Sequence, residues 1–119
     1  MASVQSTPQE INIFAILYPA PSKMNRVKEL LAGHAAATHK NEDRTVRFIV
    51  TESVDPSAEA ALYLFETYSS KDDADRHLRS ENFQILLKAA QEEELMAKHP
   101  QIVFTKTFAG YDLDRKLVQ

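Results

Sequence analysis

The sequence predicts an α+β fold with the element order β-α-β-β-α-β. Four segments carry the β-branched and aromatic residues that favour strands: residues 10–18, 45–52, 62–68 and 102–109. Two further regions, about residues 23–39 and 70–99, have apolar residues at helical spacing. Elements in this order form a four-stranded antiparallel sheet with both helical regions on one face, which is the ferredoxin-like arrangement.

The first strand is largely apolar on both of its faces. Its alternating side chains are Ile11, Ile13, Ala15 and Leu17 on one face and Asn12, Phe14, Ile16 and Tyr18 on the other. We therefore expect both faces to be covered, one by the helices and the other by a second copy of the chain. Pro19 and Pro21 end the strand, and Ser22 is expected to cap the first helix.

The later elements have similar local signals. In the second strand, three apolar side chains are expected to share a face: Val46, Phe48 and Val50. We expect the second helical region to be split in two. Ser70 and Asp73 form an approximate capping box for its first half. Ser80 opens the second half, and His99 with Pro100 is expected to end it.

A length of 119 residues predicts one domain. We place this domain at residues 10–110, with residues 1–9 as a disordered tail and 111–119 as a C-terminal tail, because both ends are polar. The formal charge of −3, without a cluster of Lys or Arg, argues against nucleic-acid binding.

The absence of several sequence patterns argues against a membrane or secreted protein and against metal, thiol and phosphate-loop sites. No apolar run approaches the ~20 residues that span a bilayer, and no signal-peptide pattern is visible, so we expect a cytoplasmic protein. The chain has no cysteine, which removes disulfides, thiolate metal sites and a cysteine nucleophile. The two glycines, Gly33 and Gly110, form no phosphate loop. His34 and His39 are not spaced as an i,i+4 metal pair. We expect neither a metal nor an organic cofactor.

The third strand and the following helix carry the candidate acid/base residues. Glu66 and Tyr68 share one face of the strand, and the helix is expected to bring His77 toward them. Each residue also has a structural interpretation. His77 could buttress the helix turn, Tyr68 could simply pack, and Glu66 could accept hydrogen bonds from a backbone amide or from a nearby arginine, Arg76 or Arg79. His34 lies on the apolar stripe of the first helix and could be a core histidine or a pocket residue.

The order of elements and two short motifs resemble the antibiotic biosynthesis monooxygenase domain family, a branch of the dimeric α/β-barrel proteins. The motifs are F-E-T-Y at residues 65–68 and A-x-x-H-L-x-S-x-x-F at residues 74–83. The resemblance covers about residues 10–109 and departs at two points. Glu42-Asp43-Arg44 stands where Glu-Pro-Gly is common, and Tyr68 stands where tryptophan is common.

The resemblance implies a homodimer whose two sheets close into a barrel. It also implies a small enzyme that oxidises phenols, anthrones or naphthols without flavin or metal. The catalytic candidates are His77, Tyr68 and Glu66, and the substrate-binding candidates are Phe83, Phe65 and His34. We expect the ligand site between sheet and helices.

Two functional hypotheses follow. The first is a cofactor-independent oxygenase of aromatic or polyketide metabolism, or a related version that keeps the acid/base chemistry without oxygen, as a cyclase, dehydratase or isomerase. The second is a non-catalytic dimeric barrel that binds a small apolar ligand or serves as a stress-response accessory protein.

Overall fold

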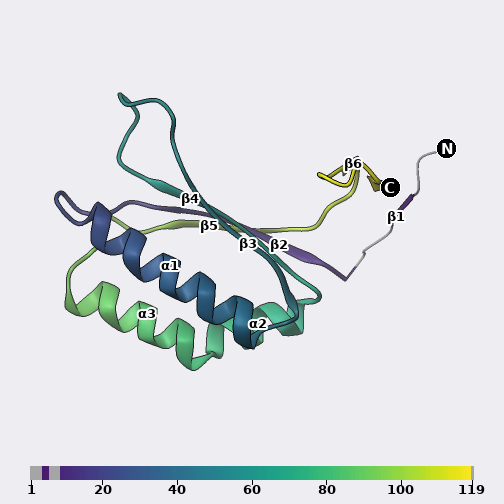
Figure 1. The fold of residues 1–119 in the computed structure, drawn as a ribbon, viewed down its shortest axis with the longest axis horizontal. Helices are drawn as coiled ribbons and strands as arrows, with labels where there is room; N and C mark the ends of the chain where they lie inside the picture. The colour runs from purple at the N-terminus through teal and green to yellow at the C-terminus, as the bar shows by residue number, and fades with distance from the viewer. Residues whose placement is uncertain (1–3, 6–8, 119) are drawn as a thin grey trace.

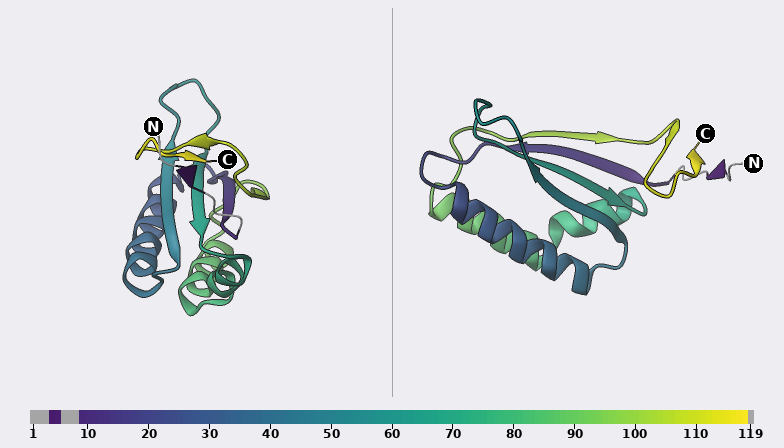
Figure 2. Two further views of the ribbon diagram at one scale, coloured as in Figure 1. Left: turned by 90° about the vertical axis from the view of Figure 1, so that its right-hand side faces the viewer. Right: turned by 45° about the horizontal axis from the view of Figure 1, so that its top comes forward.

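The computed structural model describes residues 4–5 and 9–118, and it has the predicted α+β, ferredoxin-like fold. The four-stranded sheet has the order β3-β4-β2-β5, and every neighbouring pair is antiparallel. The strands are β2 (Ile11–Leu17), β3 (Thr45–Glu52), β4 (Leu62–Tyr68) and β5 (Gln101–Thr105). Three helices cover one face of this sheet: α1 (Met24–Asn41), α2 (Lys71–Arg79) and α3 (Glu81–Glu92) (Figures 1 and 2).

The strand register decides which side chains meet the helices. Ile13 pairs with Glu66, and Phe14 pairs with Phe65, so these two pairs lie on opposite faces of the sheet. A bulge between Thr45 and Arg47 shifts the register of β3. Val46 consequently lines a depression on the face away from the helices. The expectation that it shares a face with Phe48 and Val50 is therefore wrong, since those two pack against the core.

The predicted split of the second helical region is confirmed by its caps. The hydroxyl of Ser70 accepts a hydrogen bond from the backbone N–H of Asp73 at the start of α2. Ser80 ends α2 and caps α3, since its hydroxyl accepts from the backbone N–H of Phe83. The extended backbone of Ser80 lets the chain turn between the two helices.

The predicted cap of α1 is wrong. Ser22 lies inside the preceding turn with φ of 70°, and the N-cap position belongs to Lys23, whose side chain makes no capping hydrogen bond. The backbone N–H of Lys23 donates to the carbonyl of Ala20 and closes this turn. Because Ser22 is part of this turn, its hydroxyl is not at the N-cap position of α1.

Helix α3 ends at Glu92, well before the expected stop at His99 and Pro100. Glu94 has φ of 50°, which directs Leu95 into the core, where it is 1% exposed. Backbone hydrogen bonds then tie the following residues to the β2–α1 connection: Ala20 N–H to Leu95 O and Ala97 N–H to Tyr18 O. Tertiary packing of Leu95 therefore ends the helix earlier than the sequence pattern predicts.

The core lies between the sheet and α1. Its buried members are Ala15, Val27, Leu31, Leu62, Leu64 and Leu95. Burying one such leucine side chain contributes about 1.5–3 kcal/mol. This cluster fixes α1 on the sheet beside a cavity between the sheet and the helices. No helix among the described residues is both long and apolar enough to cross a bilayer.

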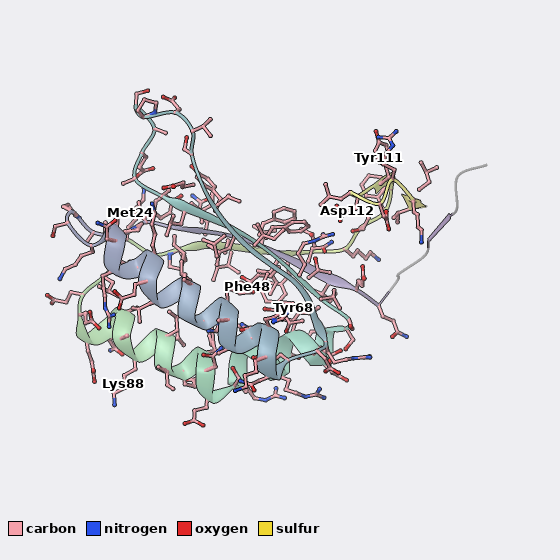
Figure 3. The ribbon with its side chains drawn as sticks, viewed as in Figure 1. Met24, Phe48, Tyr68, Lys88, Tyr111 and Asp112 are labelled. Carbon is pink, nitrogen blue, oxygen red and sulfur yellow. The ribbon has the colours of Figure 1, made fainter. Side chains whose placement is uncertain are left out.

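The terminal segments form a small second sheet beyond the end of the main one (Figure 3). Its strands are β1 (Val4–Gln5), β6 (Gly110–Tyr111) and β7 (Leu117–Val118), and β1 pairs parallel with β7. The tails expected at residues 1–9 and 111–119 thus contain paired residues, while residues 1–3, 6–8 and 119 lie outside the described part. β5 ends at Thr105, earlier than expected, and Thr107 accepts a hydrogen bond from the Asn12 amide.

Candidate functional site

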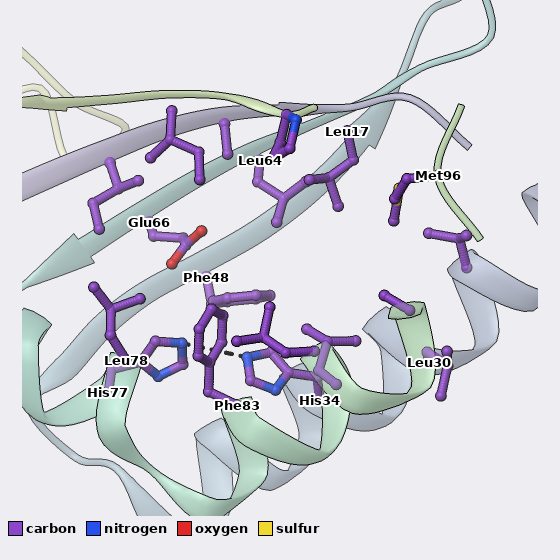
Figure 4. Close-up of a pocket in the computed structure, with 18 of the residues that line it drawn as sticks. Leu17, Leu30, His34, Phe48, Leu64, Glu66, His77, Leu78, Phe83 and Met96 are labelled. Atoms are coloured by element: carbon purple, nitrogen blue, oxygen red, sulfur yellow. Dashed lines mark hydrogen bonds between the residues drawn. The ribbon is translucent and has the colours of Figure 1, made fainter. Parts of the chain in front are cut away.

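A largely apolar cavity of about 280 Å³ lies between the sheet and the helices. The sheet supplies the wall on one side, and α1, α2 and α3 supply the other (Figure 4). Among its lining side chains, three have ionisable groups: His34, Glu66 and His77. A concave apolar space with a few polar groups is the usual composition of a small-molecule site.

Glu66 brings a carboxyl group to the sheet side of this cavity. It lies on β4 opposite Phe48 of β3 and Ile13 of β2, so its side chain points toward the helices (Figure 4). The hydroxyl of Tyr68 donates a hydrogen bond of 2.5 Å to Glu66 Oε1. Burial raises the pKa of Glu66, and the Tyr68 hydrogen bond and His77 oppose that rise. The neutral form of this carboxyl group is thereby favoured more than in water.

Tyr68 positions the carboxyl group of Glu66 through this hydrogen bond. Its side chain is fully buried and does not line the cavity. Burial is the main reason that the pKa of its hydroxyl is raised, and the neighbouring Glu66 adds to the effect. Tyr68 therefore remains a neutral hydrogen-bond donor. Arg76, one of the two arginines considered as partners of Glu66, donates a hydrogen bond to Asp73 instead.

His77 has a partner at each ring nitrogen. Nδ1 lies 2.7 Å from Glu42 Oε1, and Nε2 lies 3.3 Å from Nε2 of His34. An ionised carboxylate can only accept, so Nδ1 of His77 carries the proton that bonds Glu42. In a neutral His77, Nε2 must then accept the N–H of His34 Nε2. These two contacts favour the buttressing interpretation of His77.

His34 completes a buried chain that runs from Glu42 through His77. Its side chain is 4% exposed, and its ring lies edge-on to Phe48 at a centroid distance of 5.3 Å. Burial, and secondarily the neighbouring His77, lowers the pKa of His34. Its Nδ1 is the one buried side-chain nitrogen or oxygen in the described part of the chain that lacks a hydrogen-bond partner.

Of the two phenylalanines expected to bind substrate, one lines the cavity and the other lies on the opposite face of the sheet. Phe83 lines the cavity, with its ring centroid 5.5 Å from that of His77. Phe65 does not line the cavity, because alternation along β4 places it opposite to Glu66. It stacks on Phe14 at 4.7 Å and lies beneath the guanidinium of Arg47. The structure therefore places Phe65 on the bare face of the sheet, away from the other candidates.

Sequence reasoning missed the site role of Glu42. This residue follows α1, its side chain is 20% exposed, and it lines a second, more polar depression together with His77. The ring of His77 thus separates the apolar cavity from this outer depression. In sequence, Glu42 lies 35 positions from His77. The one signal at Glu42 was that Glu42-Asp43-Arg44 differs from the Glu-Pro-Gly common in the family that the sequence resembles. Within residues 4–5 and 9–118, no group of three or more His, Asp or Glu side chains is placed to hold a metal ion.

Comparison with known proteins identifies the fold. No family model and no curated protein matches the sequence. Solved structures match along most of the chain. A candidate antibiotic biosynthesis monooxygenase from Caulobacter crescentus has a TM-score of 0.74 and 23% identity, covering 85% of this chain and 92% of the other. Rv0793 from Mycobacterium tuberculosis has a TM-score of 0.71 and 24% identity, covering 82% and 94%.

A second candidate antibiotic biosynthesis monooxygenase, from Nitrosomonas europaea, has a TM-score of 0.73 and 16% identity. It covers 83% of this chain and 90% of the other. At these identities the likeness concerns the fold. The chain has the fold of the antibiotic biosynthesis monooxygenase-like proteins, which confirms at that level the resemblance noted in the sequence.

Proposed function

We propose that the protein is a small cofactor-independent enzyme of aromatic or polyketide metabolism that removes a proton from a phenolic or anthrone-like substrate. The observation that carries this proposal is the apolar cavity with one buried carboxyl group and two buried histidines in its wall. Monooxygenase names among the structures of the same fold support it.

The cavity would act first by excluding water. Aromatic rings fit against its apolar walls, for example against Phe48 and Phe83. With water displaced, the few polar groups interact more strongly with charge that develops on the substrate. The orientation of the substrate supplies a further share of the rate enhancement.

The substrate itself would be the reductant in the oxygenase version. The O–H or activated C–H bond breaks, the proton passes to the protein, and the electron pair stays on the substrate. The resulting anion transfers an electron to O₂, recombination forms a carbon–oxygen bond, and the protein returns the proton to the peroxide. Loss of water from the peroxide then leaves the quinone. In the version without oxygen, the same anion would cyclise, isomerise or eliminate water.

Dithranol, an anthrone, and 1-naphthol test the proposal under air and under argon. We expect O₂ consumption and quinone absorbance above the rate of the protein-free solution in air, and none under argon. Ala90→Phe, which fills the cavity from α3, should abolish the difference, whereas Ala89→Phe, outside the cavity lining, should retain it. Turnover that persists under argon would instead support the cyclase, dehydratase or isomerase version.

A non-catalytic ligand-binding barrel is the second candidate. The observation that favours it is that both nitrogens of His77 already have protein partners, so this ring is occupied before a ligand enters. Saturable binding of both compounds, with no product under either gas, would support the binding protein and contradict the enzyme.

A further inference from the structure

We infer that Oε2 of Glu66 is the atom that receives the substrate proton, and that Tyr68 is the positioning residue behind it. This inference rests on the proposed function and names the group that performs its first step. The substrate O–H bond breaks, a proton–oxygen bond forms at Glu66 Oε2, and the electron pair remains on the substrate oxygen. The histidines then belong to the wall of the site.

The geometry separates the two oxygens of this carboxyl group. Oε1 is engaged by the hydroxyl of Tyr68 at 2.5 Å. Oε2 has no hydrogen bond in the described part of the chain, yet it is not among the buried atoms that lack a partner. It is therefore reachable from the cavity that Glu66 lines, and Figure 4 shows the carboxyl group directed into that space.

The other polar groups of the cavity are less available. Nδ1 of His77 is paired with Glu42, and its Nε2 is paired with His34. The unpaired nitrogen of His34, Nδ1, is fully buried, so a ligand in the cavity does not reach it without a rearrangement. Glu66 is left as the cavity residue with an unoccupied, accessible lone pair.

The surroundings of Glu66 make its carboxylate a stronger base than a glutamate in water. Its own strand contributes Tyr68, α2 contributes His77, and the end of α1 contributes Glu42. The strands on each side face it with apolar residues, Ile13 and Phe48. Burial raises the pKa of Glu66, which moves a carboxyl group toward the range where general bases are efficient.

A pair of probe ligands measures the contact without turnover. 1-Naphthol carries the O–H group, and naphthalene has the same rings without it. We expect wild-type protein, at a pH where Glu66 is ionised, to prefer 1-naphthol. Glu66→Gln should reduce that preference about tenfold, because a hydrogen bond to a charged acceptor is lost. Glu92→Gln, which changes an exposed carboxylate of α3 outside the cavity lining, should leave the preference unchanged.

The positioning role of Tyr68 has a separate readout. The preference for 1-naphthol should rise with pH as Glu66 ionises. Tyr68→Phe removes the hydrogen bond that lowers the pKa of Glu66, so the rise should move to higher pH. Tyr63→Phe, on the opposite face of β4, is the matched control and should not move it.

The outcomes distinguish the inference from the proposed function. If neither ligand binds the wild-type protein, both the proposed function and this inference are contradicted. If both ligands bind and Glu66→Gln leaves the preference for 1-naphthol intact, the assignment of Glu66 is overturned while the cavity remains a ligand site. An unchanged pH profile in Tyr68→Phe would remove Tyr68 from its positioning role.

Discussion

At the scale of single residues, the site consists of two separate hydrogen-bonded groups that face one cavity. Tyr68 and Glu66 form the first group, on β4. Glu42, His77 and His34 form the second, which joins the end of α1 to α2 and returns to α1. The first group leaves an oxygen open to a ligand, whereas the second satisfies most of its own polar atoms. We therefore assign the reacting role to Glu66 and a supporting role to His77 and His34.

His77→Ala should lower the free energy of unfolding by about 1–3 kcal/mol, because it leaves partners of a buried hydrogen-bonded side chain unpaired. His39→Ala, on the exposed side of α1, is the matched control and should change stability little. Urea unfolding of both variants measures the effect. Equal stability of the two variants would contradict a buttressing role for His77.

Glu66→Gln should become progressively more stable relative to wild type as pH rises above about 4.5, the ordinary pKa of this group. Burial raises the folded-state pKa of Glu66, so the folded protein holds this proton more tightly than the unfolded chain. Its stabilising contribution is complete below the unfolded pKa and is lost as pH rises through the folded pKa. Thermal unfolding across acidic to neutral pH tests this. A constant difference between the two proteins would show that the pKa is not raised.

At the scale of secondary-structure elements, the turn between α2 and α3 positions both His77 and Phe83. The hydroxyl of Ser80 donates to the carbonyl of His77 and accepts from the N–H of Phe83. One side chain thus closes the first helix and opens the second. The same short turn sets the angle at which two cavity residues approach the sheet.

Ser80→Ala should cost about 1 kcal/mol of stability, the usual effect of losing an N-cap side chain. It should also weaken 1-naphthol binding, because Phe83 and His77 lose their shared support. Ser69→Ala, one residue before the N-cap of α2, provides the control. Chemical unfolding and ligand titration give the two readouts, and a stability equal to that of the control would contradict the capping role.

At the scale of the whole molecule, the face of the sheet opposite the helices carries exposed apolar side chains. They include Phe14, Ile49, Tyr63 and Val103, which are 38–55% exposed. Apolar patches of this kind commonly mark a protein interface. We therefore propose that the protein forms a homodimer with the two sheets face to face.

Sedimentation at micromolar concentration should give about twice the chain mass of 13.5 kDa. Phe14→Glu, which places a charge in the middle of this face, should shift the mass to that of a monomer. Ile85→Glu, at a similarly exposed apolar residue on α3, should leave the dimer intact. A wild-type protein that sediments as a monomer would contradict the barrel arrangement.

Local signals in the sequence were sufficient for most of the fold. The bounds of β3 and β4 match the predicted ranges, 45–52 and 62–68, because β-branched and aromatic residues there are flanked by turn residues. The caps Ser70 and Ser80 were also readable, since a capping side chain bonds an amide only three residues away. The spacing of neighbouring residues is enough to predict such short-range interactions.

Tertiary structure decided the remaining features because they depend on contacts between distant segments. Leu95 ends α3 by entering a core that the helix pattern alone does not reveal. The sequence identified Glu66, Tyr68 and His77 as candidates, but only the packing showed that Tyr68 serves Glu66 and that His77 is bound by Glu42. Residue types and periodicity predict which face a side chain takes, whereas the three-dimensional arrangement determines which partner it finds there.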